Sequence, residues 1–357
     1  MKALATNVCL HYRTSSMLYL LVAVASAFLF AARLNICVNA FNAESCPLKL
    51  LPSQIQCTEL SQSYPETMFT KLFSSEPRRA YALENVTLSL CCQESSGSSG
   101  VTLLVGASGS GKSVLLRLLA GVEIPSSGVV QINGEKLTYS KSSRNFRAPT
   151  KHSSEYLDWG SKTIVGTNLN ERSHERNVQP IIIDRYYQKD SCSASNSHPR
   201  KTVEGYLMKL GRDYFNGDLN QDGEILLSSL IQKITSIAGI SPLDSSSCQP
   251  RDLSVSNQLL FRIACACVES VLPALSLVPS QGTSQDFCVF GPVLLLDEFL
   301  DSESTVVAQR VARGLHSLCL LAGAAVVIAT HKPHHFTADS SIVVQQKITL
   351  VGGRILI

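Results

Sequence analysis

The sequence carries little net charge and few aromatic residues. Its 357 residues have a formal charge of +3 at pH 7, and only 6% are aromatic and 17% charged. A charge this close to neutral gives no electrostatic reason to expect a nucleic acid or an anionic membrane as partner. The chain is nevertheless 45% hydrophobic, which is typical of a globular protein with a sizeable core and excludes a disordered one.

The twelve cysteines lack the spacing of a metal site. No Cys-x-x-Cys pair occurs, and no cysteine and histidine stand at ligand spacing. We therefore interpret the cysteines as mostly free thiols in a reducing compartment. No internal repeat is visible, and the length allows about two domains.

Long hydrophobic runs are missing except for one near the start. The apolar run Met17–Ala32 follows several basic residues and is short for a bilayer span, which needs about 20 residues. Small-x-small sites follow at Ala25-Ser-Ala27 and Val38-Asn-Ala40. The pattern predicts a secretory-type signal peptide, with an uncleaved membrane anchor as the alternative.

Both candidate cleavage sites are followed by phenylalanine, Phe28 and Phe41. This arrangement resembles the bipartite plastid presequence of algae with complex plastids, in which a transit peptide follows the signal peptide. We therefore expect residues 1–65 to be a removed presequence and residues 66–357 to be the mature domain, at the stromal face of a plastid membrane. The alternative is an endomembrane association through an uncleaved N-terminal segment.

The segment Leu103–Gly121 reads as an apolar strand, a glycine loop and an amphipathic helix. The spacing Gly-x4-Gly-Lys-Ser within it is that of a phosphate-binding loop, in which backbone N–H groups and the helix start face a polyphosphate. Lys112 would reach the β- and γ-phosphates, and Ser113 would coordinate Mg²⁺. The predicted nucleotide contacts are Gly106, Ala107, Ser108, Gly109, Ser110, Gly111, Lys112, Ser113 and Val114.

Strand and helix patterns alternate over the rest of the chain and predict an α/β fold. The alternation favours a mainly parallel sheet with helices on both faces. The expected segments are N-terminal antiparallel strands including 82–90 and 129–132, a polar insertion at 136–177, a strand at 180–184, a helical subdomain at 201–271, a strand at 293–296, a helix at 303–318, a strand at 324–329, and two terminal strands closing at Gly352-Gly353.

Two apolar strands end in residues that can act on a nucleotide. Asp297 and Glu298 follow the run Val293–Leu296, and His331 follows the run Ala325–Thr330. Ligands bind at the carboxyl edge of parallel sheets, so we expect Asp297 to hold Mg²⁺, Glu298 to polarise the attacking water and His331 to contact the γ-phosphate.

These motifs resemble, in order, those of the ATP-binding cassette (ABC) ATPases. The resemblance runs from Glu66 to Ile357 and includes Leu294–Glu298, Ala329–His331 and Gly352–Arg354. It implies an ATPase that uses ATP and Mg²⁺, works as a homo- or heterodimer of cassettes and couples to a separate membrane permease. It also implies that Gln188 touches Mg²⁺, senses the γ-phosphate together with His331 and couples to the transport partner. An aromatic residue, Phe73 or else Tyr81, is implied to stack on adenine.

The sequence departs from that family in its signature, Leu-Ser-Gly-Gly-Gln. The segment ahead of Arg262-Ile-Ala-Cys-Ala266 offers Val255–Leu259 or Leu253–Asn257, and neither register contains the glycines. Ser256 lies in both and is the expected contact to nucleotide. Side chains in place of glycine would crowd the backbone approach, which predicts weak hydrolysis. The loop after Glu298 is also short, with Asp301 as its only aspartate. The alternative function is a soluble, non-transport ABC-type ATPase with an assembly or regulatory role.

Overall fold

The computed structural model describes residues 48–64, 80–91, 100–137, 178–184, 187, 201–215, 217, 219, 221–275 and 287–356. Residues 48–357 form one compact unit. The expected signal peptide, both cleavage sites, Phe73, Gln188 and nearly all of the polar insertion lie outside the described residues, as does the side chain of Tyr81.

A six-stranded sheet forms the centre of this unit, in the order β12-β11-β4-β10-β9-β7. Its strands are β4 (Val101–Val105), β7 (Pro180–Asp184), β9 (Val293–Asp297), β10 (Ala325–Thr330), β11 (Val344–Val351) and β12 (Arg354–Leu356). All neighbours are parallel except β11 and β12. Strands β4 and β10 are buried along their whole length, as their mostly apolar sequences predict. The predicted fold class is therefore confirmed.

A four-stranded antiparallel sheet, β3-β2-β5-β6, accompanies the central sheet. It consists of β2 (Gln54–Tyr64), β3 (Ala80–Cys91), β5 (Ser127–Ile132) and β6 (Glu135–Lys136), and a separate parallel pair joins β1 (Leu48–Leu51) to β8 (Phe287–Phe290). Strand β2 lies between β3 and β5 and buries Ile55, Cys57 and Leu60. Strands β1 and β2 lie before the expected domain start at residue 66 but belong to the folded unit, because β1 pairs with β8 and β2 supplies hydrogen-bond partners to both β3 and β5.

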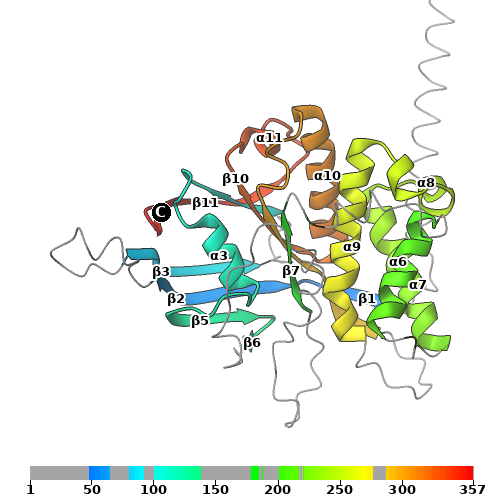
Figure 1. Cartoon of the computed structure of the whole chain (residues 1–357), viewed down its shortest axis with the longest axis horizontal. Helices are drawn as coiled ribbons and strands as arrows, with labels where there is room; N and C mark the ends of the chain where they lie inside the picture. The colour runs from blue at the N-terminus through cyan, green and yellow to red at the C-terminus, as the bar shows by residue number, and fades with distance from the viewer. Residues whose placement is uncertain are drawn as a thin grey trace, which may run out of the picture. The chain divides into compact units, whose positions relative to one another are not determined.

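The helices gather mainly on one side of the molecule, at the right of Figure 1. The predicted helical subdomain is confirmed as α6 (Val203–Tyr214), α7 (Gln221–Ala238), α8 (Pro242–Ser247), the 3₁₀ turn η4 (Pro250–Asp252) and α9 (Val255–Leu275). The other helices in the described parts of the chain are α3 (Lys112–Leu119), α10 (Thr305–Ala322) and α11 (His334–Thr337).

Helix α9 is long and apolar enough to cross a membrane by length and composition. In the fold, however, 83% of its apolar window is buried, and it packs against α6, α7 and α10. It is therefore a core helix of the folded unit. Of the cysteines that the structure describes, Cys57, Cys248 and Cys267 are free thiols, as predicted.

Candidate functional site: a phosphate-binding loop at the carboxyl edge of the sheet

The glycine loop joins the end of β4 to the start of α3 and has the backbone of a phosphate cradle. Gly109 and Gly111 have φ angles of +77° and +102°, a region that side chains other than glycine rarely adopt. A Cβ atom on Gly111 would also meet the carbonyl oxygen of Ala82 at 2.5 Å. Ala107, Ser108 and Gly109 are exposed, so the crest of the loop is open to a ligand.

Lys112, the first residue of α3, turns back over this loop. Its Nζ donates to the carbonyl oxygens of Gly106 at 2.9 Å and Ala107 at 3.1 Å and lies 3.4 Å from His331 Nε2. The side chain is only 4% exposed, and this burial lowers the pKa of Lys112 while the nearby carboxylates of Glu298 and Asp297 oppose the shift. A buried cation among carbonyl oxygens is well placed for phosphate oxygens.

Ser113 and Asp297 meet as expected for a magnesium site. The Ser113 hydroxyl donates to Asp297 Oδ1 at 3.0 Å, which joins the P-loop helix to the end of β9. Burial raises the pKa of Asp297, and the charge of Glu298 adds to the shift, whereas the Ser113 hydrogen bond opposes it. Mg²⁺ in such sites takes one or two carboxylates plus phosphate oxygens and waters. Among the described residues no group of three or more His, Cys, Asp or Glu forms a metal site, and the residues present fit a nucleotide-bound Mg²⁺.

Glu298 and His331 come together from the ends of β9 and β10. His331 Nε2 lies 2.9 Å from Glu298 Oε1. The backbone of Glu298 is held at φ +50°, and its N–H donates to the carbonyl oxygen of Ala329 at 3.0 Å. A left-handed non-glycine residue is uncommon, and here it sets the carboxylate at the edge of the sheet where phosphates would lie.

Asp301 has a role that its motif position did not reveal. Its carboxylate accepts hydrogen bonds from the Thr330 hydroxyl at 2.5 Å and from the His331 backbone N–H at 2.8 Å. The turn after β9 is therefore tied to the end of β10, directly at the predicted γ-phosphate contact. The sequence shows only an aspartate in a short loop. It does not indicate the hydrogen bonds of Asp301, because the partners Thr330 and His331 lie far along the chain.

Ser256 lies at the start of α9, where Ser254 caps the helix. The Ser254 hydroxyl accepts from the Asn257 N–H at 3.4 Å and lies 3.4 Å from Ser256 Oγ. Asn257 in turn bonds Asp244 at 3.2 Å and Arg310 at 2.8 Å. In the part of the chain that the structure describes, these contacts hold the start of α9 and do not reach the P-loop. The predicted contact of Ser256 to the nucleotide of a second cassette therefore stays a prediction.

Two further predicted contacts differ in burial. Ser110 is 5% exposed, and its hydroxyl has no hydrogen-bond partner among the described residues, an orphaned group at the base of the loop. Val114 is half-buried and packs against the core. A valine there offers no hydroxyl to a phosphate.

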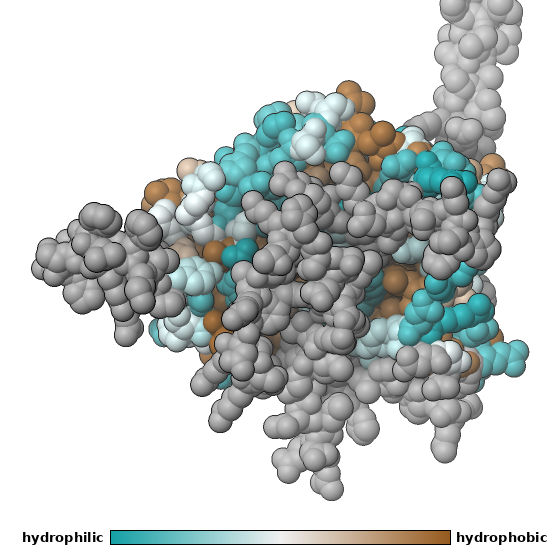
Figure 2. Space-filling view, viewed as in Figure 1, coloured by the Kyte–Doolittle hydropathy of each residue, from teal (hydrophilic) through white to brown (hydrophobic). Residues whose placement is uncertain are grey.

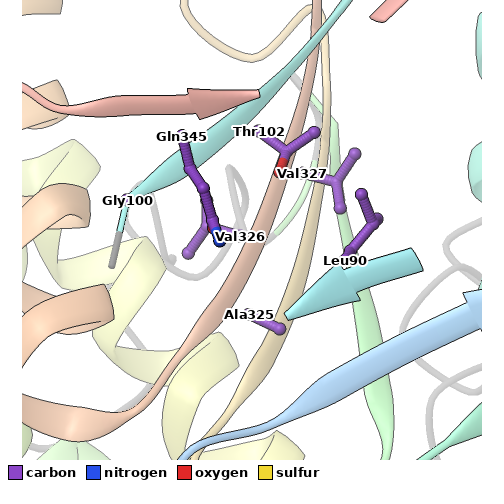
Figure 3. Close-up of a pocket in the computed structure, with 7 residues that line it drawn as sticks. All are labelled: Leu90, Gly100, Thr102, Ala325, Val326, Val327 and Gln345. Carbon is purple, nitrogen blue, oxygen red and sulfur yellow. The ribbon is translucent and has the colours of Figure 1, made fainter. Parts of the chain in front are cut away.

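A small pocket elsewhere on the sheet is separate from this loop. Figure 3 shows Thr102 of β4, Ala325 of β10 and Gln345 of β11 among its lining residues. Thr102 and Ala325 lie near the amino ends of their strands, whereas the P-loop, Asp297 and His331 lie at the carboxyl ends. The pocket is thus at the wrong edge of the sheet for the nucleotide site.

Fold and site together define a P-loop nucleoside triphosphatase of the cassette type. The profile of the ABC transporter family matches residues 88–271, and the chain belongs to this family.

Several known proteins are similar to the chain. The nickel import ATP-binding protein NikE of Shigella boydii is 28% identical over 260 residues, which are 72% of each chain. The nitrate import ATP-binding protein NrtD of Synechocystis is 36% identical over 72 residues, 20% of this chain and 25% of NrtD. The lipoprotein-releasing system ATP-binding protein LolD of Bordetella pertussis is 41% identical over 64 residues, 18% of this chain and 25% of LolD. Among solved structures, cbiO1 of Clostridium perfringens, part of the ABC transporter complex cbiONQ, matches with 16% identity and a TM-score of 0.47 over 85% of this chain and 86% of that one.

Proposed function

We propose that the chain binds and hydrolyses ATP as the nucleotide-binding subunit of an ABC-type transporter. The observation that carries this proposal is the convergence of Lys112, Ser113, Asp297, Glu298 and His331 at one edge of the sheet. Lys112 would neutralise the β- and γ-phosphates, and Ser113 with Asp297 would hold Mg²⁺, which when bound offsets phosphate charge.

Glu298 would orient the attacking water and accept its proton, since its carboxylate is half-exposed and held by the backbone turn at the sheet edge. His331, 2.9 Å from that carboxylate and 3.4 Å from Lys112 Nζ, would contact the γ-phosphate. The Glu298 carboxylate would thus accept the proton of the water close to Lys112, whose positive charge would stabilise the negative charge that develops on the phosphate.

The partners we propose are a second cassette and a separate integral membrane permease. Two similar proteins carry import in their names and a third belongs to a lipoprotein-releasing system, which supports a role in a transport complex. Hydrophobic side chains gather over α10 at the top of Figure 2, and Val306 in the first turn of that helix is 76% exposed. An exposed apolar surface of this kind favours contact with another subunit.

We infer that the signature of this cassette is degenerate and that hydrolysis is weak without the native partner. The start of α9 carries Val255, Ser256 and Asn257, so side chains stand where glycines would let a phosphate approach the backbone. A partner cassette with an intact signature would supply the missing half of the site.

We further propose that the chain acts at the stromal face of a plastid membrane. The support is the sequence alone: a short apolar run followed by Ala-Ser-Ala27 and Phe28. Isolation of the tagged full chain from plastid membranes should recover a permease with it, and recovery of soluble proteins without any permease would favour an assembly role.

The catalytic part is tested with Glu298→Gln, which keeps the shape of the side chain and removes its negative charge. In the presence of the native partner, the wild type should hydrolyse ATP at least about a hundredfold faster than the variant, while both bind ATP alike. Equal turnover of the two proteins would refute hydrolysis at this site.

A further inference from the structure

The turn between β11 and β12 carries a sequence motif that the proposed chemistry does not use. It consists of Gly352 and Gly353, and Arg354 follows as the first residue of β12. Strand β11 runs parallel to β4 in a register that pairs Thr349 with Val105, the last residue of β4 before the P-loop. The turn therefore lies just beyond the carboxyl edge of the sheet, beside the P-loop.

This turn is hydrogen-bonded directly to the P-loop. The Gly353 N–H donates to the carbonyl oxygen of Ser110 at 3.1 Å. In a planar trans peptide the C=O and the N–H point in opposite directions, so this bond turns the N–H of Gly111 away from the β11–β12 turn. The φ of Gly111 is +102°, a region that glycine enters at little cost, and without the bond this peptide plane could rotate easily.

The turn is in turn held against β3. The Glu84 N–H donates to the carbonyl oxygen of Gly353 at 2.9 Å, and Arg354 Nη2 lies 2.7 Å from Glu84 Oε2. A Cβ atom on Gly353, whose φ is +79°, would lie 2.6 Å from the carbonyl oxygen of Ala82, so glycine is needed for this close approach. Strand β12, red at the chain end in Figure 1, also packs against β3.

We propose that Gly353 is a positioning residue for nucleotide binding, because its N–H keeps the peptide between Ser110 and Gly111 in the orientation that presents an N–H group to the phosphates. A peptide turned the other way would present a carbonyl oxygen, which repels phosphate oxygens, in place of a donor that binds them. This inference rests on the proposed function of the site. It deepens that function by adding the C-terminal turn to the features that set nucleotide affinity.

The test is a fluorescence titration of the full chain with a fluorescent ATP analogue in excess Mg²⁺. Gly353→Ala should raise the dissociation constant about tenfold or more, the effect of losing one hydrogen bond to a charged phosphate, because the added methyl group pushes the turn off β3 and away from Ser110. The matched control is Gly352→Ala. Gly352 also has a positive φ, +54°, but its Cβ would meet no described atom within 4 Å, so this variant should stay within about twofold of wild type.

A second control separates nucleotide affinity from stability. Gly314→Ala places a Cβ atom 2.8 Å from the carbonyl oxygen of Ala238, where α10 meets α7. It should lower the unfolding temperature without changing the affinity of the folded protein. An unchanged affinity in Gly353→Ala, or an equal loss in either control, would overturn the positioning role.

If Gly353→Ala does not fold, Arg354→Ala decides. The side chains of Arg354 and Glu84 are 65% and 40% exposed, and an exposed ion pair contributes little to stability, so this variant should fold. Its looser turn should raise the dissociation constant about threefold, and Glu84→Gln added to it should cause no further loss. Unchanged affinity in Arg354→Ala would then overturn the inference. Failure of the wild type to bind the analogue would instead overturn the proposed function of the whole site.

Discussion

Asp301→Ala should uncouple the histidine from the catalytic turn while leaving nucleotide binding intact. The substitution removes two hydrogen bonds to a charged acceptor, from the Thr330 hydroxyl and the His331 N–H. Bonds of this kind contribute about 1.5–3 kcal/mol each. Thr330 is 1% exposed, so its hydroxyl would lose a partner that water does not easily replace, whereas water can reach the half-exposed His331. We therefore expect a loss of about 2–3 kcal/mol in unfolding free energy.

The larger effect should be on turnover. A displacement of about 1 Å at a reacting group can cost about a hundredfold, so Asp301→Ala should lower kcat about 10- to 100-fold in the presence of the native partner. The dissociation constant for ATP should change less than about twofold, because the hydrogen bonds of Lys112 to the loop carbonyls and of Ser113 to Asp297 do not involve Asp301. Glu303→Ala, in the same loop, is the control and should change neither quantity.

A double-mutant cycle with His331→Ala gives the decisive comparison. If Asp301 acts by positioning His331, the turnover effect of Asp301→Ala should largely vanish once the histidine side chain is gone. An undiminished effect in the His331→Ala background, or unchanged turnover in the single variant, would refute the reasoning. Thermal unfolding of each variant shows whether the protein remains folded.

Three other outcomes follow from the structure. Lys112→Met should raise the dissociation constant of ATP about a hundredfold, about 3 kcal/mol, by isothermal calorimetry, and unchanged affinity would mean that the lysine does not meet phosphate. A chain that begins at residue 66 should fail to fold by circular dichroism, whereas one that begins at residue 48 should fold. The buried side chains of Ile55 and Leu60 in β2 each contribute about 1.5–3 kcal/mol, whereas the stability of a whole domain is about 5–15 kcal/mol. Burial raises the pKa of Cys57 to about 11, so a thiol reagent at pH 8 should modify Cys57 only after unfolding in urea, as peptide mass spectrometry can detect; modification of the native protein would place β2 outside the fold.

The parts of the fold that were predictable carry local signals. Strands β9 and β10 arise from unbroken apolar stretches that end in a polar residue, and β4 is apolar except for Thr102. Such sequences are typical of buried parallel strands. The P-loop was equally predictable, since its glycines are required by the positive φ angles of a loop only a few residues long. The sequence does not predict strand β2, although Ile55 and Cys57 alternate with polar residues, because the segment lies within the region whose pattern is typical of a presequence.

The parts that were not predictable depend on contacts between distant residues. Strand register pairs Asp184 with Asp297 across more than a hundred positions of chain, and no short pattern reports which strand ends are neighbours. The bonds of Asp301 to Thr330 and His331 likewise cross from one strand end to another. Sequence patterns thus identified residues that act through their own motif, whereas residues that act through a neighbouring strand required the assembled sheet.

Arg262 links α9, the last helix of the helical subdomain, to the strand ends that carry the candidate site. Its guanidinium bonds the main chain at Asp184 and Tyr187 and lies 4.8 Å from the ring centre of Phe299, the residue after Glu298. One cation thus contacts α9's neighbours at the end of β7, in the turn at Tyr187 and in the turn after Glu298. A partner that tilts α9 would therefore change the position of Glu298, and a nucleotide that fixes the position of Glu298 would change the tilt of α9. Because coupling is reciprocal, the coupling free energy is the same in both directions. The Arg262 side chain thus couples the position of α9 to the position of Glu298 in both directions.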